Sequence, residues 1–99
     1  MIKYALFARF EAKPGKETAV ADFLQTGLAL AKQEPGTKYW FALRLSERVF
    51  GVFDAFETEE ARQAHLDGPI AQALMAQAPE LFASPPSIEA IEVLGLKAA

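Results

Sequence analysis

The sequence contains no cysteine and only one histidine, His65, among its 99 residues. The absence of cysteine excludes disulfides, cysteine-based zinc sites, iron–sulfur clusters and thiol chemistry. A single histidine also excludes a metal centre built from several histidines. Any chemistry of this chain must therefore rely on a small number of polar side chains.

Long hydrophobic runs and clusters of positive charge are also missing. No apolar stretch approaches the roughly 20 residues of a membrane span, and Met1-Ile2-Lys3 leads into a strand pattern without the features of a signal peptide. The net charge is −3 at pH 7, and Lys and Arg do not form the patches typical of nucleic-acid binding. We therefore expect a cytoplasmic protein that binds neither nucleic acid nor membrane.

Hydrophobic residues make up 52% of the chain and charged residues 23%, a balance that excludes disorder. Domains typically contain roughly 100–150 residues. We therefore expect residues 1–99 to form a single domain.

The hydrophobic pattern predicts four strands. Apolar side chains alternate along residues 2–11, which indicates a strand with one face buried. Residues 37–45 and 49–56 are rich in aromatic side chains on either side of Ser46-Glu47-Arg48, so we expect a hairpin there. The last strand is predicted at residues 87–97.

Two helical regions separate these strands. Residues 16–32 carry apolar side chains every three or four positions, which predicts an amphipathic helix that Glu34-Pro35-Gly36 terminates. Thr58 is expected to cap a second helix, which breaks near Asp67-Gly68 and continues from Pro69 to Pro79. The order β-α-β-β-α-β predicts an α+β, ferredoxin-like antiparallel sheet with helices on one face.

Both faces of this predicted sheet are apolar. A face without helices should be polar, and each large apolar side chain left exposed would forgo on the order of 1.5–3 kcal/mol. No loop is long enough to cover that face within a monomer, so we expect a homodimer formed sheet to sheet. The residues predicted in the interface are Phe7, Trp40, Phe53, Ile91 and Val93.

Six segments occur in an order and at intervals that match a known family. They are Ala8–Lys16, Glu34–Gly36, Val52–Thr58, Ala64–Leu66, Gly68–Pro69 and Pro79–Phe82. Through them nearly the whole chain resembles the antibiotic biosynthesis monooxygenase family of dimeric α+β barrels, which includes quinol monooxygenases. The resemblance implies dimerisation through the sheets and a small-molecule pocket between sheet and helices. Members oxygenate phenolic or quinol substrates without metal or flavin, degrade haem, or isomerise small metabolites.

Two positions depart from the haem-degrading branch of that family. Members of that branch carry Asn on the first strand, Trp at the end of the third strand and His on the following helix. This chain has Ala8 and Phe56 at the first two positions and matches only at His65. The departures argue against haem degradation and against a Trp-dependent role at Phe56.

His65 is the first candidate for a catalytic residue. An unperturbed pKa of about 6.5 suits histidine to proton exchange near neutral pH. Ala61, Ala64 and His65 share one helix face, so the imidazole should point between helix and sheet. The alternative is a structural histidine that hydrogen-bonds to a carbonyl or to an aspartate.

Asp54 is the second candidate. The expected pairing places its carboxylate on the helix-facing side of the sheet, where it needs a partner or takes a raised pKa. His65, Arg44, or the hydroxyl of Tyr4 or Tyr39 could supply that partner, and the expected pairing puts Arg44 on the other face, which favours His65 or a tyrosine. An ion pair or a strand-end hydrogen bond without catalytic use is the alternative. The residues expected to bind substrate are Tyr4, Tyr39, Phe41, Phe56 and Met75.

These residues and the resemblance favour a cofactor-independent monooxygenase that acts on a small quinol or phenolic aromatic with O₂. His65, oriented by Asp54, would remove the phenolic proton, and Tyr39 or Tyr4 would donate a hydrogen bond to the phenolate. We expect no cofactor, because one histidine and no phosphate-binding loop give it little to hold. An isomerase of the same fold and a non-catalytic small-ligand-binding dimer are the alternatives.

Overall fold

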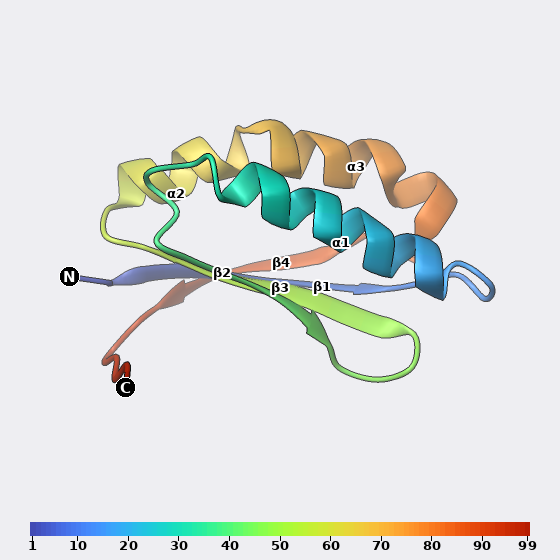
Figure 1. Ribbon diagram of the computed structural model, residues 1–99, viewed down its shortest axis with the longest axis horizontal. Coiled ribbons are helices and arrows are strands. Elements are labelled where there is room, and N and C mark those ends of the chain that lie inside the picture. Colours follow the sequence, from blue (N-terminus) through green and yellow to red (C-terminus); the bar gives the residue numbers. More distant parts are fainter.

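The computed structural model describes residues 1–99 and contains one four-stranded antiparallel sheet with three helices on one face (Figure 1). The strands are β1 (Tyr4–Glu11), β2 (Tyr39–Arg44), β3 (Val49–Phe56) and β4 (Ser87–Glu92), and the helices are α1 (Glu17–Ala31), α2 (Glu59–Leu66) and α3 (Pro69–Leu81). The strand order in the sheet is β2-β3-β1-β4. The predicted ferredoxin-like α+β fold is confirmed. None of the helices has the length and apolar character that a membrane span requires.

Local signals in the sequence explain where the second and third helices begin. The Thr58 hydroxyl accepts a hydrogen bond from the Ala61 N–H at 3.0 Å, as expected of a helix cap. Pro69 occupies the start of α3, where a missing N–H costs no helical hydrogen bond. The helix was predicted to end at Pro79 but continues to Leu81. A proline in the last turn removes one hydrogen bond, and the burial of Leu81 favours the extra residues.

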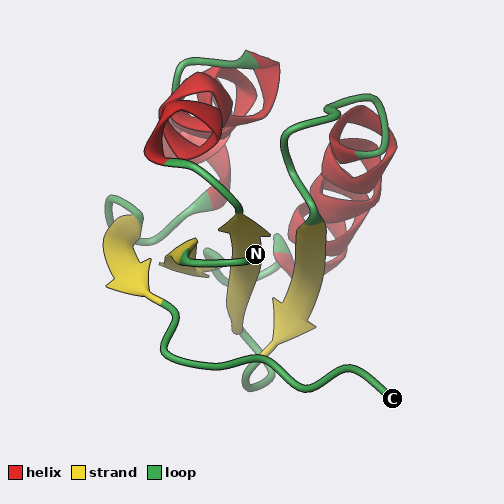
Figure 2. Ribbon diagram, turned by 90° about the vertical axis from the view of Figure 1, so that its left-hand side faces the viewer, coloured by secondary structure: helices red, strands yellow, loops and turns green.

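The last strand is shorter than predicted, because it ends at Glu92 rather than at residue 97. Its partner β1 begins at Tyr4, which pairs with Glu92. The Val93 N–H still donates to the Lys3 carbonyl at 2.8 Å, and beyond that bond β1 offers no further backbone groups. The tail after β4 crosses the face of the sheet that carries no helix (Figure 2).

The core lies between the helices and the sheet, where α1 and α3 cover β1 and β3 (Figure 2). Val20 and Leu24 of α1 and Leu74 of α3 pack onto Phe10 and Val52. The spacing of apolar residues along α1 therefore predicts its buried face correctly.

The side chains of strand β2 point to the opposite faces of the sheet from those predicted. The prediction placed Tyr39 and Phe41 on the same face as Asp54, whereas the structure pairs Trp40 with Asp54 and Phe41 with Phe53. Three residues separate Leu45 from Val49, and the Leu45 N–H donates to the Val49 carbonyl at 2.8 Å. A change of register by one residue turns every side chain of a strand to the other face. The assignment of Trp40 to the dimer interface was therefore wrong.

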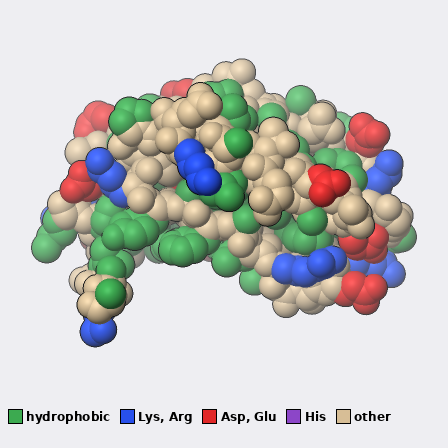
Figure 3. Space-filling view, viewed as in Figure 1, with side chains coloured by type: hydrophobic (Ala, Val, Ile, Leu, Met, Phe, Trp, Pro, Cys, Tyr) green, Lys and Arg blue, Asp and Glu red, His purple; other side chains and the backbone are tan.

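The face of the sheet without helices, here called the open face, is apolar as predicted. Phe7 and Phe53 pair across β1 and β3, and Ile91 pairs with Ala5 on the same face. The corrected register adds Phe41, which is 51% exposed. Hydrophobic side chains gather on the underside of the molecule between the C-terminal tail and the β2–β3 hairpin (Figure 3).

A close approach of two strands on the open face makes Gly51 sensitive to substitution. A Cβ at Gly51 would lie 2.9 Å from the Ala8 carbonyl oxygen and 3.2 Å from the Phe7 ring. We expect Gly51→Ala to lower the free energy of unfolding by about 1–3 kcal/mol, because the backbone must shift to admit the methyl group. Gly95→Ala is the control, since a Cβ there has no atom within 4 Å. Equal urea midpoints for the two variants would contradict this expectation.

Candidate functional site

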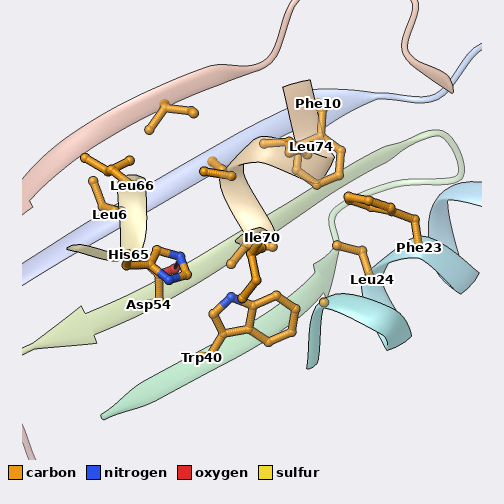
Figure 4. Close-up of a pocket in the computed structure, with 15 residues that line it drawn as sticks. Leu6, Phe10, Phe23, Leu24, Trp40, Asp54, His65, Leu66, Ile70 and Leu74 are labelled. Atoms are coloured by element: carbon orange, nitrogen blue, oxygen red, sulfur yellow. Dashed lines mark ion pairs between the residues drawn. The ribbon is translucent and has the colours of Figure 1, made fainter. Parts of the chain in front are cut away.

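An internal cavity of about 50 Å³ lies between α1, α3 and the sheet. Hydrophobic residues make up 12 of the 15 that line it. The exceptions are Asp54 and His65, together with Gly27, which contributes no side chain. Figure 4 shows Asp54, His65 and the Trp40 indole toward one end, with Phe10, Phe23 and Leu74 away from them. The cavity therefore has one polar end and otherwise apolar walls.

The imidazole of His65 lies between two carboxylates. Its Nε2 is 2.8 Å from Asp54 Oδ2, and its Nδ1 is 2.7 Å from Glu34 Oε1. The Thr37 hydroxyl donates to the same Glu34 oxygen at 2.7 Å. The Phe56 ring lies against the imidazole with centroids 5.4 Å apart. Because both ring nitrogens face acceptors, this geometry fits the protonated imidazolium, which donates from both.

Burial and hydrogen bonding shift the pKa values of both partners. Burial raises the pKa of Asp54 and outweighs the opposing effect of its hydrogen bond to His65. Burial also acts to lower the pKa of His65, but the hydrogen bonds and negative charges of Asp54 and Glu34 together outweigh it and raise that pKa. His65 is therefore a cation over a wider pH range than a free histidine.

Two polar atoms beside the cavity have no hydrogen-bond partner within the chain. They are Asp54 Oδ1 and Trp40 Nε1, both inaccessible to solvent. Trp40 and Asp54 are directly opposed across β2 and β3, so their side chains project from the same face. An unpaired buried polar group costs about 1–3 kcal/mol. Both residues line the cavity, so one unpaired acceptor and one unpaired donor lie in its wall.

The predicted contact between Asp54 and His65 is present, but none of the five residues expected to bind substrate lines the cavity, and three of them lie on other surfaces of the protein. Tyr39 and Phe41 lie on the open face, because the register of β2 differs from the predicted one. Met75 is 57% exposed on the outer side of α3 and does not line the cavity.

Tyr4 and Phe56 share the helix-facing side with Asp54, but neither lines the cavity. The Arg62 guanidinium lies 5.2 Å from the centre of the Tyr4 ring and covers it. Phe56 is fully buried and packs against the imidazole of His65, so it positions that ring. Arg44, considered as a partner for Asp54, instead lies over the Phe50 ring.

Sequence reasoning missed Glu34 and Trp40 as parts of this site. Glu34 was interpreted only as part of a helix-terminating segment, although that segment recurs in the family resemblance and brings a carboxylate to the end of α1. Trp40 would have been found from the loop length alone, since a three-residue loop places it opposite Asp54. Glu34 and Asp54 bind opposite nitrogens of one imidazole, and these acidic and imidazole groups do not form a metal-ligand cluster.

The four-stranded antiparallel sheet and the helix layer on one of its faces define a ferredoxin-like α+β protein. The sequence model described as antibiotic biosynthesis monooxygenase matches residues 3–77. The chain therefore belongs to the antibiotic biosynthesis monooxygenase family. No curated protein matches the sequence at a significant level.

Solved structures support the same fold. A protein of unknown function from Nitrosomonas europaea is 57% identical, with a TM-score of 0.96 over 100% of this chain and 96% of its own. A Mycobacterium tuberculosis protein is 20% identical, with a TM-score of 0.84 over 97% of this chain and 99% of its own. A second Nitrosomonas europaea protein is assigned by its name to the antibiotic biosynthesis monooxygenases. It is 17% identical, with a TM-score of 0.82 over 93% of this chain and 90% of its own.

The raised pKa of His65 predicts that stability depends on pH. A group whose pKa is higher in the folded than in the unfolded chain stabilises the fold fully below its unfolded pKa, about 6.5 for histidine. This contribution is lost as the pH rises through the folded pKa of His65. The raised pKa of Asp54 acts in the same direction, from about pH 3.9 upward.

We therefore expect the free energy of unfolding, measured in urea, to fall as the pH rises above about 6.5. The His65→Gln variant keeps every other titratable group, including the terminal amine, so subtracting its pH profile leaves the contribution of His65 together with that of the carboxylates it contacts. A difference between the two profiles that stays constant from pH 6 to 9 would contradict the pKa direction.

Proposed function

We propose that this protein is a cofactor-independent monooxygenase that oxidises a single-ring hydroquinone or related phenol with O₂. One observation carries the proposal: a buried, hydrogen-bonded Asp54–His65 pair lies at one end of an otherwise apolar cavity. Membership of a family described as monooxygenases supports the reaction class. The apolar walls suit an aromatic ring, and the polar end suits its hydroxyl group.

The substrate hydroxyl would bind to the two unpaired atoms of the site. Its oxygen would accept a hydrogen bond from Trp40 Nε1, and its proton would be donated to Asp54 Oδ1. Trp40 thereby takes the donor role expected of Tyr39 or Tyr4. Both nitrogens of His65 are occupied by carboxylates, so Asp54 Oδ1 is the atom that would receive the substrate proton. The imidazolium would then stabilise the phenolate through its positive charge.

The phenolate is electron-rich and can transfer an electron to O₂ without a metal or flavin. Recombination of the resulting radical pair forms a carbon–oxygen bond, and loss of water from the peroxide leaves a hydroxyquinone. One oxygen atom of O₂ enters the ring and the other leaves as water, while the hydroquinone supplies all four electrons. The protons removed in the first steps are returned when water forms.

The size of the cavity limits the substrate. A dry cavity of about 150 Å³ holds one benzene ring, whereas this one measures about 50 Å³. A single ring would therefore enter only if the half-buried side chain of Phe23, away from the polar end, moves aside. Substrates with two or more fused rings should be poor.

The first test measures oxygen uptake with a panel of single-ring hydroquinones and follows ¹⁸O₂ into the product. We expect Asp54→Asn to lower kcat about 10²–10⁴-fold, the usual contribution of a positioned general base. Asp22→Asn makes the same change at an exposed position on α1 and should retain wild-type activity. A fall of less than about threefold in Asp54→Asn would remove Asp54 from the mechanism.

The product distinguishes the proposed reaction from the alternatives. Incorporation of one labelled oxygen atom supports the monooxygenase. A product of unchanged mass would indicate an isomerase, and binding without turnover would indicate a ligand-binding protein. Either of these results would overturn the proposal.

We further infer that the open face forms a homodimer. Phe7, Phe41, Phe53 and Val93 supply a continuous apolar surface, and dimers are general in the family to which the chain belongs. Ile91 lies on the same face. An obligate interface of this type commonly buries more than about 2,000 Å² in total.

Light scattering at micromolar concentration should report twice the 10.8 kDa mass of one chain. Phe41→Glu changes a side chain that is already half exposed in the protomer, so it should split the dimer without unfolding the chain. Met75→Glu is the matched control on the helical side, and it should remain dimeric. A wild-type particle of 10.8 kDa would contradict the inference.

A further inference from the structure

His65 lies between two separate hollows of the molecule. On one side it lines the internal cavity together with Asp54. On the other it lines a surface hollow of about 320 Å³, together with Glu34 and Thr37. The segment after α1 that carries Glu34 lies beside α2, as Figure 1 shows. A single imidazole therefore lines both the cavity and the surface hollow.

A continuous chain of hydrogen bonds joins these hollows. Asp54 lines the cavity, and its Oδ1 has no hydrogen-bond partner, whereas its Oδ2 is 2.8 Å from His65 Nε2. His65 Nδ1 is 2.7 Å from Glu34 Oε1. The exposed fraction of the side chain rises from 4% at Asp54 and 7% at His65 to 20% at Glu34.

We propose that Asp54, His65 and Glu34 form a proton relay between the cavity and the solvent, with Glu34 at its outer end. The proposal rests on the proposed function, in which a substrate hydroxyl supplies the proton at the inner end. Glu34 would pass protons to and from the solvent. Its carboxylate contacts His65 but does not line the cavity, so it does not touch a molecule bound there.

The relay requires two proton transfers, each over one hydrogen bond, and a third that releases the proton of Glu34 to water. The substrate O–H bond breaks and its proton binds to Asp54 Oδ1. The Nδ1–H bond of the imidazolium also breaks, and that proton passes to Glu34 Oε1 and then to water in the surface hollow. Before and after, the three side chains together carry one negative charge: first two carboxylates and a cation, then one carboxylate, one carboxylic acid and a neutral imidazole. Both transfers run in reverse when water is formed.

The groups around the imidazole leave the path from Asp54 through His65 to Glu34 as the direct one for a proton. The charged groups that act on His65 are Asp54 from β3 and Glu34 from the segment after α1. Phe56 covers one side of the ring. Glu34 Oε2 lies 3.6 Å from the position that a Cβ of Gly68 would take, so a glycine at the start of α3 leaves space around the outer carboxylate.

The test measures exchange of the His65 ring N–H protons with water by NMR, and it needs no substrate. His65 is the only histidine, so its ring signals are assigned without ambiguity. Glu34→Gln keeps the size of the side chain and an oxygen that accepts from Nδ1, but the amide does not take up a proton. We expect exchange to slow at least tenfold and the pKa of His65 to fall. Glu60→Gln, which removes one exposed carboxylate from α2, should change neither.

Turnover supplies a second measurement. In Glu34→Gln we expect kcat for the hydroquinone to fall about tenfold with KM unchanged, and imidazole buffer to restore kcat as its concentration rises. Such rescue indicates a lost proton path, because a purely structural defect does not respond to buffer. Glu34→Asp retains a titratable carboxylate, so its exchange rate should lie between those of the wild type and Glu34→Gln, and it tests the relay if Glu34→Gln does not fold.

Equal exchange rates in the wild type and Glu34→Gln would overturn the relay. Slower exchange in a protein that oxidises no hydroquinone would instead leave the relay standing and refute the proposed oxidation. A fall in kcat that buffer does not rescue, without any change in exchange, would assign Glu34 a structural role and also overturn the relay.

Discussion

The burial of Asp54 is the constraint on which the site depends. A carboxylate taken out of water is costly unless a cation and further hydrogen bonds compensate it. His65 supplies that compensation at 2.8 Å, and Glu34 at 2.7 Å on the other ring nitrogen stabilises the imidazolium. These three residues come from β3, α2 and the segment after α1. One electrostatic requirement thus fixes how three distant parts of the chain meet.

Small residues make this meeting possible. A Cβ at Gly36 would lie 3.1 Å from the Ala61 Cβ, so the segment carrying Glu34 packs directly on α2 because neither position has a larger side chain. A Cβ at Gly27 would lie 3.2 Å from the Trp40 indole, which fills the space beside α1 and keeps its nitrogen on the cavity side of the sheet. The polar end of the cavity is therefore set by close packing as much as by charge.

Periodicity and capping signals in the sequence predicted the order of elements and the cap at Thr58, because both depend on residues close together in the chain. The contact between Asp54 and His65 was predicted because a buried carboxylate needs a partner. The face of β2 was mispredicted although the three-residue loop was predicted correctly, because the strands were paired one residue out of the register that this loop sets. Glu34 was missed for a different reason. Its role arises from contact between two segments 31 residues apart, and no local pattern records such a contact.

The same geometry would serve oxygenation and isomerisation, because both begin with removal of a hydroxyl proton at the polar end. The two reactions diverge in what happens to the anion. O₂ is apolar and partitions into hydrophobic space, so the leucine, isoleucine and phenylalanine walls of this cavity favour its presence beside a phenolate while excluding the water that would protonate the anion. Isomerisation instead requires a proton donor at a second position, and the remaining cavity walls carry no side chain that can act as one. The distribution of polarity around the cavity therefore supports the proposed oxygenation over isomerisation.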